Sequence, residues 1–193
     1  MMADTKYCLC CGENVPYNHV ERNERRELTC AYCGFTLDVQ TLWDPSMAGE
    51  GHVLVAEDSK YVRNIIVEAL KATKFSAHVL AVENGLELTT SFAKLVSEHA
   101  AIDLAIIDLN MPIMDGITAA RTLRAIESQH KMSATPVIFF SAVKADESLK
   151  AQMDMLTPAS YMNKGTDPDP ESLAKRVEQL VGYLIEKYKT PPR

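Results

Sequence analysis

The sequence has no long apolar run. Among its 193 residues, no stretch approaches the ~20 consecutive apolar residues that a membrane-spanning helix requires. It also lacks the charged and then apolar leader of a secretory signal peptide, and it has no internal repeat or low-complexity segment. These absences argue against membrane, secreted and repeat proteins, and we expect a cytoplasmic protein.

Basic residues are too few for a general nucleic-acid-binding surface. The chain has 20 Lys and Arg residues against 26 Asp and Glu residues, a formal net charge of −6. This balance favours a soluble protein that contacts other proteins. With 47% hydrophobic residues, a chain of this length can form one domain with a full core, or one such domain and a small module. We favour the second arrangement.

Cysteine is absent after residue 33. The five cysteines include two Cys-x-x-Cys-Gly sequences, in which Cys8 is paired with Cys11 and Cys30 with Cys33. This spacing is typical of a zinc site with four thiolate ligands. Two disulfides are the alternative, which a reducing cytoplasm disfavours. Cys10 is left over, and although it could compete with Cys8 or Cys11 as a ligand, only those two reproduce the spacing of the second pair.

The fragment around these cysteines, residues 1–42, resembles a zinc ribbon with weak strands at residues 27–29 and 35–39. A module this small cannot bury enough apolar surface to fold alone, so the metal is expected to form its core. Four thiolates leave no open coordination position, and the zinc is therefore predicted to be structural rather than catalytic. Residues 1–45 contain four basic and seven acidic side chains, which favours protein docking or dimerisation over nucleic-acid binding.

A linker is expected at residues 43–51, which contain one proline and two glycines. After it, strands and helices alternate five times, the pattern of an α/β domain with a doubly wound, five-stranded parallel sheet. The predicted strands cover residues 52–59, 78–82, 103–108, 135–142 and 159–164, and the predicted helices cover residues 61–74, 85–99, 116–129, 145–155 and 170–188.

Polar groups lie at the ends of four of these strands. Glu57 and Asp58 lie near the end of the first, Asp108 ends the central strand, Ser141 lies at the end of the fourth and Lys164 at the end of the fifth. Because the carboxyl ends of parallel strands meet at one edge of a sheet, these side chains should converge. Three clustered carboxylates repel one another unless a cation lies among them, and oxygen ligands suit Mg²⁺. Together with a hydroxyl and an ammonium group, they predict a phosphoryl-transfer site with an aspartate nucleophile.

Residues 52–189 resemble the receiver domain of two-component response regulators, and we place this domain at residues 52–193. The resemblance lies in the acidic pair Glu57-Asp58, the motif Asp-Leu-Asn-Met-Pro-Ile-Met-Asp-Gly at residues 108–116, Ser141 with Ala142, Tyr161 and Lys164. It implies a flavodoxin-like fold. Gly165 departs from the family, which usually has a cis-peptide-forming proline after the lysine.

The resemblance also implies a role for each of these residues. Asp108 would accept a phosphoryl group from a phosphohistidine on a sensor histidine kinase or a phosphotransfer protein. Lys164 would neutralise charge on the transferred group, while Ser141 and Tyr161 would form the switch that repacks the surface. The implied Mg²⁺ ligands are Asp58, Asp108 and the backbone carbonyl of Asn110, with Glu57 acting through water. The receiver would assist its own phosphorylation and dephosphorylation, and it would not be a conventional enzyme.

Only residues 190–193 follow the last predicted helix, so we expect no C-terminal effector domain. Output would then come from phosphorylation-dependent contacts with an unidentified downstream protein, and homodimer formation stays open. One alternative is a nucleic-acid-binding transcriptional regulator that reads through the zinc ribbon. A haloacid-dehalogenase-type phosphatase is a second alternative, but it needs an aspartate where this chain has Asn110.

Overall fold

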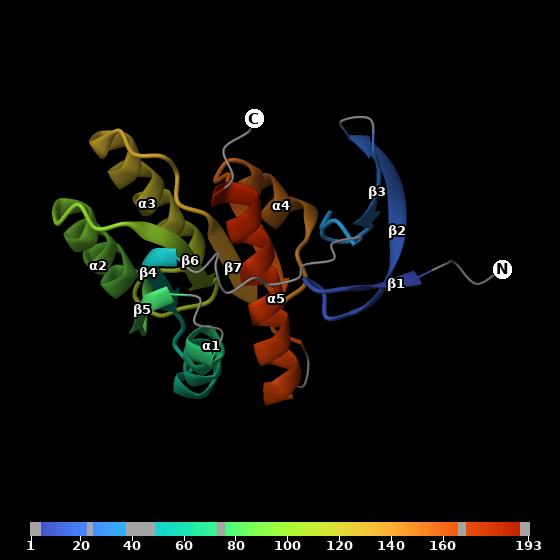
Figure 1. The fold of residues 1–193 in the computed structure, drawn as a ribbon, viewed down its shortest axis with the longest axis horizontal. Helices are drawn as coiled ribbons and strands as arrows, with labels where there is room; N and C mark the ends of the chain where they lie inside the picture. Colours follow the sequence, from blue (N-terminus) through green and yellow to red (C-terminus); the bar gives the residue numbers. More distant parts are fainter. Residues whose placement is uncertain (1–4, 23–24, 38–48, 73–75, 166–168, 190–193) are drawn as a thin grey trace.

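The computed structural model describes residues 5–22, 25–37, 49–72, 76–165 and 169–189, which form a small N-terminal sheet packed against a larger α/β unit (Figure 1). The small sheet is antiparallel and has the order β1-β2-β3, with β1 at Thr5–Cys8, β2 at Glu13–Arg22 and β3 at Arg25–Cys30. We call residues 5–37 the cysteine module. All five cysteines lie in it.

The strand expected before the second cysteine pair is present, and it is longer than predicted. It pairs along its whole length with β2, from Tyr17 opposite Cys30 to Arg22 opposite Arg25. The strand expected at residues 35–39 is reduced to one bridge between Thr29 and Thr36, and residues 38 and 39 lie outside the described residues.

The larger unit confirms the predicted five-stranded parallel sheet, whose order is β5-β4-β6-β7-β8. Helices alternate with the strands along the chain, as the hydrophobic pattern predicts. The elements are β4 (Gly49–Ala56), α1 (Lys60–Ala72), β5 (Ser76–Val82), α2 (Gly85–Ser97), β6 (Ile102–Asp108), α3 (Gly116–His130), β7 (Val137–Ser141), α4 (Glu147–Asp154), β8 (Ala159–Asn163) and α5 (Pro170–Lys189).

Two boundaries differ from the prediction. Strand β4 begins at Gly49, inside the expected linker, and the Gly51 amide donates to the Asp103 carboxylate at 3.0 Å. Residues 43–48 of that linker lie outside the described residues. Helix α4 is shorter than predicted because Asp146 caps it, accepting a hydrogen bond from the Leu149 amide at 2.7 Å.

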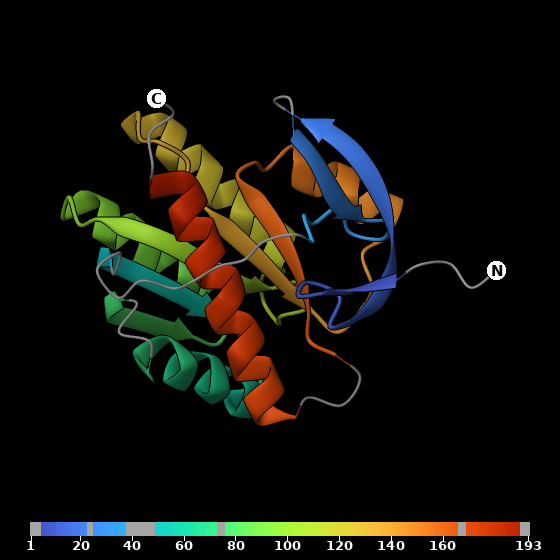
Figure 2. The same cartoon turned by 45° about the vertical axis from the view of Figure 1, so that its right-hand side comes forward.

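Alternate side chains of the sheet build a core on each face. On one face, Val53 and Val55 of β4 pack with α1 and α5, and on the other, Leu54 and Ala56 pack with α2 and α3. The buried apolar residues of the cysteine module, Val15 among them, belong to the first of these cores. Figures 1 and 2 both show the module beside α4 and α5, away from α2. In the described part of the chain, no helix is long and apolar enough to cross a membrane.

Candidate functional site

The carboxyl edge of the parallel sheet brings the predicted polar side chains together. Strands β4 and β6 are neighbours, so the residues that follow β4 lie next to Asp108 at the end of β6. Carboxylate oxygens of Glu57, Asp58 and Asp108 lie within 4.8 Å of one another. We call these three residues the carboxylate cluster. It lies where the strand order reverses, the usual place for a ligand in an open α/β sheet.

Lys164 reaches this cluster from the end of β8. Its Nζ lies 2.7 Å from Asp108 Oδ2, 2.7 Å from Glu57 Oε2 and 3.0 Å from Glu57 Oε1. The other oxygen of Asp108, Oδ1, accepts a hydrogen bond from the Asn110 amide at 3.1 Å. Asp108 is almost fully buried, so its charge is balanced by these two groups rather than by bulk water.

Glu57 is the least satisfied member of the cluster. Its Oε2 atom is buried and makes no hydrogen bond within the described residues, although the Lys164 ammonium lies close to it. Burial raises the pKa of the Glu57 carboxyl, an effect that Lys164 opposes and Asp108 adds to. Three oxygen donors that include a buried, incompletely bonded carboxylate fit a hard divalent cation such as Mg²⁺.

Arg63 is a site residue that our sequence reasoning missed. It is buried on α1, where its Nη1 donates to the backbone carbonyls of Glu57 at 2.6 Å and Asp58 at 3.3 Å. Its Nη2 donates to the Glu83 carboxylate at 2.7 Å. Arg63 therefore fixes the backbone of the acidic pair. Its one sequence signal is an arginine among the apolar positions of an amphipathic helix.

The two predicted switch residues are linked through one loop. Ser141 is fully buried, and its Oγ accepts a hydrogen bond from the Val143 amide at 3.1 Å. The Tyr161 ring is buried, its hydroxyl donates to the Val143 carbonyl, and burial raises the pKa of this hydroxyl. Asn163 Nδ2 in turn donates to the Tyr161 hydroxyl at 2.8 Å. Both side chains therefore contact the loop between β7 and α4.

Gly165 has a conformation that proline cannot adopt. Its φ is +89°, whereas the proline ring holds φ near −65°. Its amide also donates to Asn163 Oδ1 at 2.7 Å, and proline has no amide hydrogen. The glycine that departs from the family pattern thus belongs to a differently built loop, one that still brings Lys164 to Asp108.

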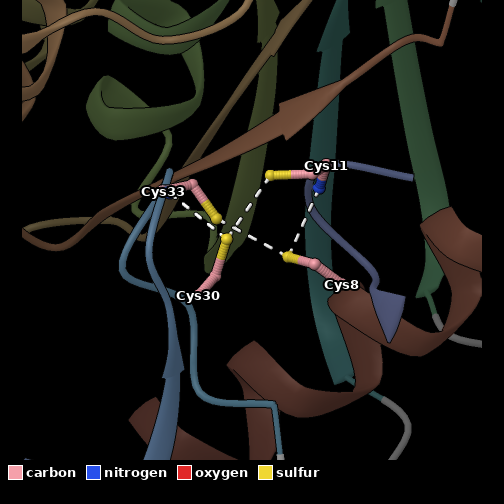
Figure 3. Close-up of side chains that lie close together, drawn as sticks. All are labelled: Cys8, Cys11, Cys30 and Cys33. Carbon is pink, nitrogen blue, oxygen red and sulfur yellow. Dashed lines mark hydrogen bonds between the residues drawn. The ribbon is translucent and has the colours of Figure 1, made fainter. Parts of the chain in front are cut away.

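The four predicted zinc ligands also lie together (Figure 3). The sulfur atoms of Cys8 and Cys33 are 3.6 Å apart, and those of Cys11 and Cys30 are 3.7 Å apart. A disulfide would need about 2 Å, whereas the corners of a tetrahedron with zinc–sulfur bonds of about 2.3 Å are about 3.8 Å apart. The arrangement fits one tetrahedral zinc ion. We call these four residues the cysteine cluster.

Backbone groups support the cysteine cluster in the same way on both sides. The amide of Cys11 donates to the sulfur of Cys8, and the amide of Cys33 donates to the sulfur of Cys30, each at 3.4 Å. Hydrogen bonds to neighbouring cysteines, chiefly to Cys10, lower the pKa of Cys33 to about 4. The hydrogen bond with Cys30 raises the pKa of Cys11.

Comparisons with known proteins agree with this geometry. The family model "Response regulator receiver domain" matches residues 53–178. A protein-glutamate methylesterase/protein-glutamine glutaminase from Vibrio parahaemolyticus is 33% identical over 137 residues, which are 70% of this chain and 33% of that protein. Hybrid signal transduction histidine kinase M from Dictyostelium discoideum is 28% identical over 90 residues, 47% of this chain and 4% of that protein. The chain thus spans about a third or less of these relatives.

Among solved structures, the receiver domain of the histidine kinase CKI1 from Arabidopsis thaliana, complexed with Mg²⁺ and BeF₃⁻, has the same fold. The TM-score is 0.61 at 20% identity, over 75% of this chain and 95% of that one. The phosphorylated cyanobacterial phytochrome response regulator RcpA gives a TM-score of 0.58 at 22% identity, over 75% of this chain and 100% of that one. By its sequence match and its fold, the chain belongs to the response regulator receiver domain family.

Proposed function

We propose that this protein is a phosphorylated response regulator of a two-component phosphorelay. Asp108 is the acceptor, and the donor is a phosphohistidine on a partner histidine kinase or phosphotransfer protein. One observation carries the proposal: the Lys164 ammonium bridges Asp108 and Glu57 at the end of the central strand, with Asp58 completing the carboxylate cluster. An aspartate nucleophile beside a lysine and a cation-binding group suits phosphoryl transfer.

The transfer step uses few protein groups. A carboxylate oxygen of Asp108 forms a bond to phosphorus while the phosphorus–nitrogen bond of the phosphohistidine breaks. The electron pair of that bond stays on the imidazole nitrogen, which takes up a proton. Lys164 neutralises charge on the non-bridging oxygens, and attack by water on phosphorus later releases phosphate and restores the carboxylate. The receiver thereby assists its own phosphorylation and dephosphorylation, without being an enzyme for a separate substrate.

Each metal has its own part in this proposal. Mg²⁺ would be held by Asp58, Asp108 and the backbone carbonyl of Asn110, with Glu57 acting through water, and it would supply positive charge to the transferred group. Zn²⁺ would be held by the cysteine cluster. Its four sulfur ligands leave no open coordination position, so its role is structural.

Output passes through protein contacts that change on phosphorylation, in keeping with the Ser141 and Tyr161 contacts to the loop before α4. Recognition of nucleic acid by the N-terminal region is disfavoured because residues 1–45 contain seven acidic and only four basic side chains. We expect the protein to act in the cytoplasm, where the cysteine thiols stay reduced.

Intact mass spectrometry with acetyl phosphate and Mg²⁺ tests the proposal. The wild type should gain one phosphoryl group, and the Asp108→Asn variant should gain none. Asp103→Asn is the matched control, because Asp103 lies on the same strand, its carboxylate accepts a hydrogen bond from the Gly51 amide, and it is not part of the carboxylate cluster. It should be phosphorylated like the wild type. An adduct that persists in Asp108→Asn would place the acceptor elsewhere.

A further inference from the structure

The cysteine module covers the edge of the parallel sheet next to Lys164. Strand β8 is the last strand of the sheet, and β7 pairs with it on one side. On the other side, the Asn163 amide donates to the Cys10 carbonyl at 2.6 Å. An edge strand has backbone groups that need partners, and here the segment between Cys8 and Cys11 supplies one. The residue after this contact is Lys164.

Arg176 of α5 joins the same two segments. Its side chain is buried, its Nε donates to the Leu9 carbonyl at 2.9 Å, and its Nη2 donates to the carbonyls of Cys10 at 3.1 Å and Asn163 at 2.7 Å. Hydrogen bonds from a charged donor are among the stronger ones in proteins. One guanidinium group therefore holds the segment between Cys8 and Cys11 and the end of β8 in a fixed relation.

Asn163 links the cysteine module and Arg176 to the candidate phosphorylation site. Its backbone forms hydrogen bonds with the Cys10 carbonyl and the Arg176 side chain. Its side chain forms hydrogen bonds with the Tyr161 hydroxyl and the Gly165 amide. It directly precedes Lys164, whose ammonium contacts both Asp108 and Glu57. A displacement of Asn163 would move Lys164 relative to the carboxylates, and small misplacements of charged groups at a reacting centre are costly.

We propose that Arg176 is a positioning residue through which the metal-loaded cysteine module sets Lys164 for phosphoryl transfer to Asp108. The inference rests on the proposed function of Asp108 and of the cysteine cluster. When the cluster holds its metal, the carbonyls of Leu9 and Cys10 are fixed and Arg176 is ordered. When the metal is lost, these partners move, and the end of β8 loses its outer support. Zinc occupancy then affects the rate of phosphorylation. If it also affects the affinity for a phosphoryl analogue, linkage requires the analogue to change zinc affinity by the same factor.

The chain contains a matched pair of glycines that separates this effect from local strain. Gly12 and Gly34 follow the two cysteine pairs, and each has a φ of +74°. A Cβ atom on Gly12 would lie 2.8 Å from Cζ of Arg176, whereas a Cβ atom on Gly34 would meet no described atom within 4 Å. Alanine strains the backbone equally at both positions. Only at Gly12 does it also displace Arg176.

The first experiment compares Gly12→Ala with Gly34→Ala in the full chain. Elemental analysis first establishes that each variant retains zinc. Phosphorylation by acetyl phosphate with Mg²⁺ is then followed by intact mass, and Gly12→Ala should be slower by roughly tenfold or more, with Gly34→Ala close to the wild type. Hydrogen exchange should show a less protected β8 in Gly12→Ala alone. Equal rates in two zinc-loaded variants would overturn the inference.

A second pair of variants leaves the cysteine module unchanged. Arg176→Met removes the contacts to Leu9, Cys10 and Asn163, while Lys175→Met changes the exposed neighbour on α5. Phosphorylation should slow in Arg176→Met and not in Lys175→Met. Arg176→Lys keeps the charge but cannot reproduce three directed hydrogen bonds, so its rate should remain below that of the wild type.

Reciprocity distinguishes positioning from a merely structural role. Zinc affinity is measured by competition with a chelator, with and without beryllium fluoride and Mg²⁺ as the phosphoryl stand-in. The wild type should show a shift of about fivefold or more, and Arg176→Met should show little or none. If the wild type is not phosphorylated at all, the proposed function fails. If it is phosphorylated, but Arg176→Met has the same rate and beryllium fluoride leaves zinc affinity unchanged, the further inference alone fails.

Discussion

The cysteine cluster and the carboxylate cluster are both suited to a metal ion, but they differ in what surrounds them. Among the described residues of the cysteine module, the buried apolar side chains are three cysteines and Val15. The carboxylate cluster instead lies on a sheet with a hydrophobic core on each face. A metal in the first site is therefore part of a folding core, while a metal in the second joins a structure that is already formed.

The largest expected effect of this difference is on folding. Cys30→Ser removes one of the four proposed zinc ligands, and structural zinc sites contribute about 10–16 kcal/mol of binding free energy. We expect residues 5–37 to lose amide protection in hydrogen exchange while β4, β6 and β7 keep theirs. Omitting Mg²⁺ from the wild type should leave both regions protected.

Cys10→Ser is the control for this experiment, because Cys10 is buried nearby but lies outside the cysteine cluster. It should retain zinc and a protected module. If the cysteine module were as well protected in Cys30→Ser as in Cys10→Ser, a metal in the cysteine cluster would not be needed for folding. The cysteine cluster would then not differ from the carboxylate cluster in this respect.

The next largest effect should come from the cation inside the carboxylate cluster. Lys164→Met leaves Asp108 and Glu57 without their ammonium partner, and removal of one partner from a buried ion pair typically costs about 3–5 kcal/mol. We expect a lower free energy of unfolding in urea, part of which Mg²⁺ should restore. Lys71→Met, which affects an exposed pair with Glu68, should change stability by only about 0.5 kcal/mol or less. Equal losses in the two variants would contradict the assigned burial of the cluster.

Glu57→Gln is expected to raise the stability of the folded protein, by less than Lys164→Met lowers it. Because burial raises the pKa of Glu57, its negative charge costs stability in the folded state. Without Mg²⁺ at neutral pH, the neutral variant should unfold at a higher temperature than the wild type. As pH falls through the raised pKa of Glu57 toward its ordinary value near 4.5, the wild type becomes protonated and the difference should disappear.

Mg²⁺ should reverse this order, since the variant lacks a carboxylate of the cluster. Thermal unfolding with and without Mg²⁺ between neutral and acidic pH measures both effects. A variant that is less stable at every pH without Mg²⁺ would show that Glu57 is well satisfied as a charged group, and that the carboxylate cluster needs no cation.

Both clusters were predictable because each depends on local spacing and on topology. The two Cys-x-x-Cys-Gly sequences fix the ligands within each pair, and parallel strands must bring Asp108 and Lys164 to one edge. What could not be predicted is how the two units pack. Arg176 lies in an amphipathic helix, where an arginine is usually read as a surface residue, and one of its partners, Leu9, is 167 residues away. Its role depends on carbonyl groups that only the tertiary structure brings together.

The smallest expected effect concerns the exposed ion pair that links the two regions. Glu13 at the start of β2 lies 2.5 Å from Nζ of Lys144 in the loop before α4, and the same Nζ lies 5.6 Å from the centre of the Tyr32 ring. Glu13 raises the pKa of Lys144, but the Lys144 side chain is 70% exposed and that of Glu13 is 43% exposed, so salt screens their attraction. Glu13→Gln should therefore leave zinc content and the phosphorylation rate nearly unchanged.

A double-mutant cycle of Glu13→Gln and Lys144→Gln, read out as amide protection of β8, measures the coupling of this pair. We expect a small coupling that vanishes at about 1 M salt, where the Debye length is about 3 Å. The loss of protection in Arg176→Met should be larger and insensitive to salt, since its hydrogen bonds are buried. A salt-sensitive coupling as large as the Arg176 effect would mean that surface charge, rather than the buried contact at Asn163, holds the cysteine module against the receiver.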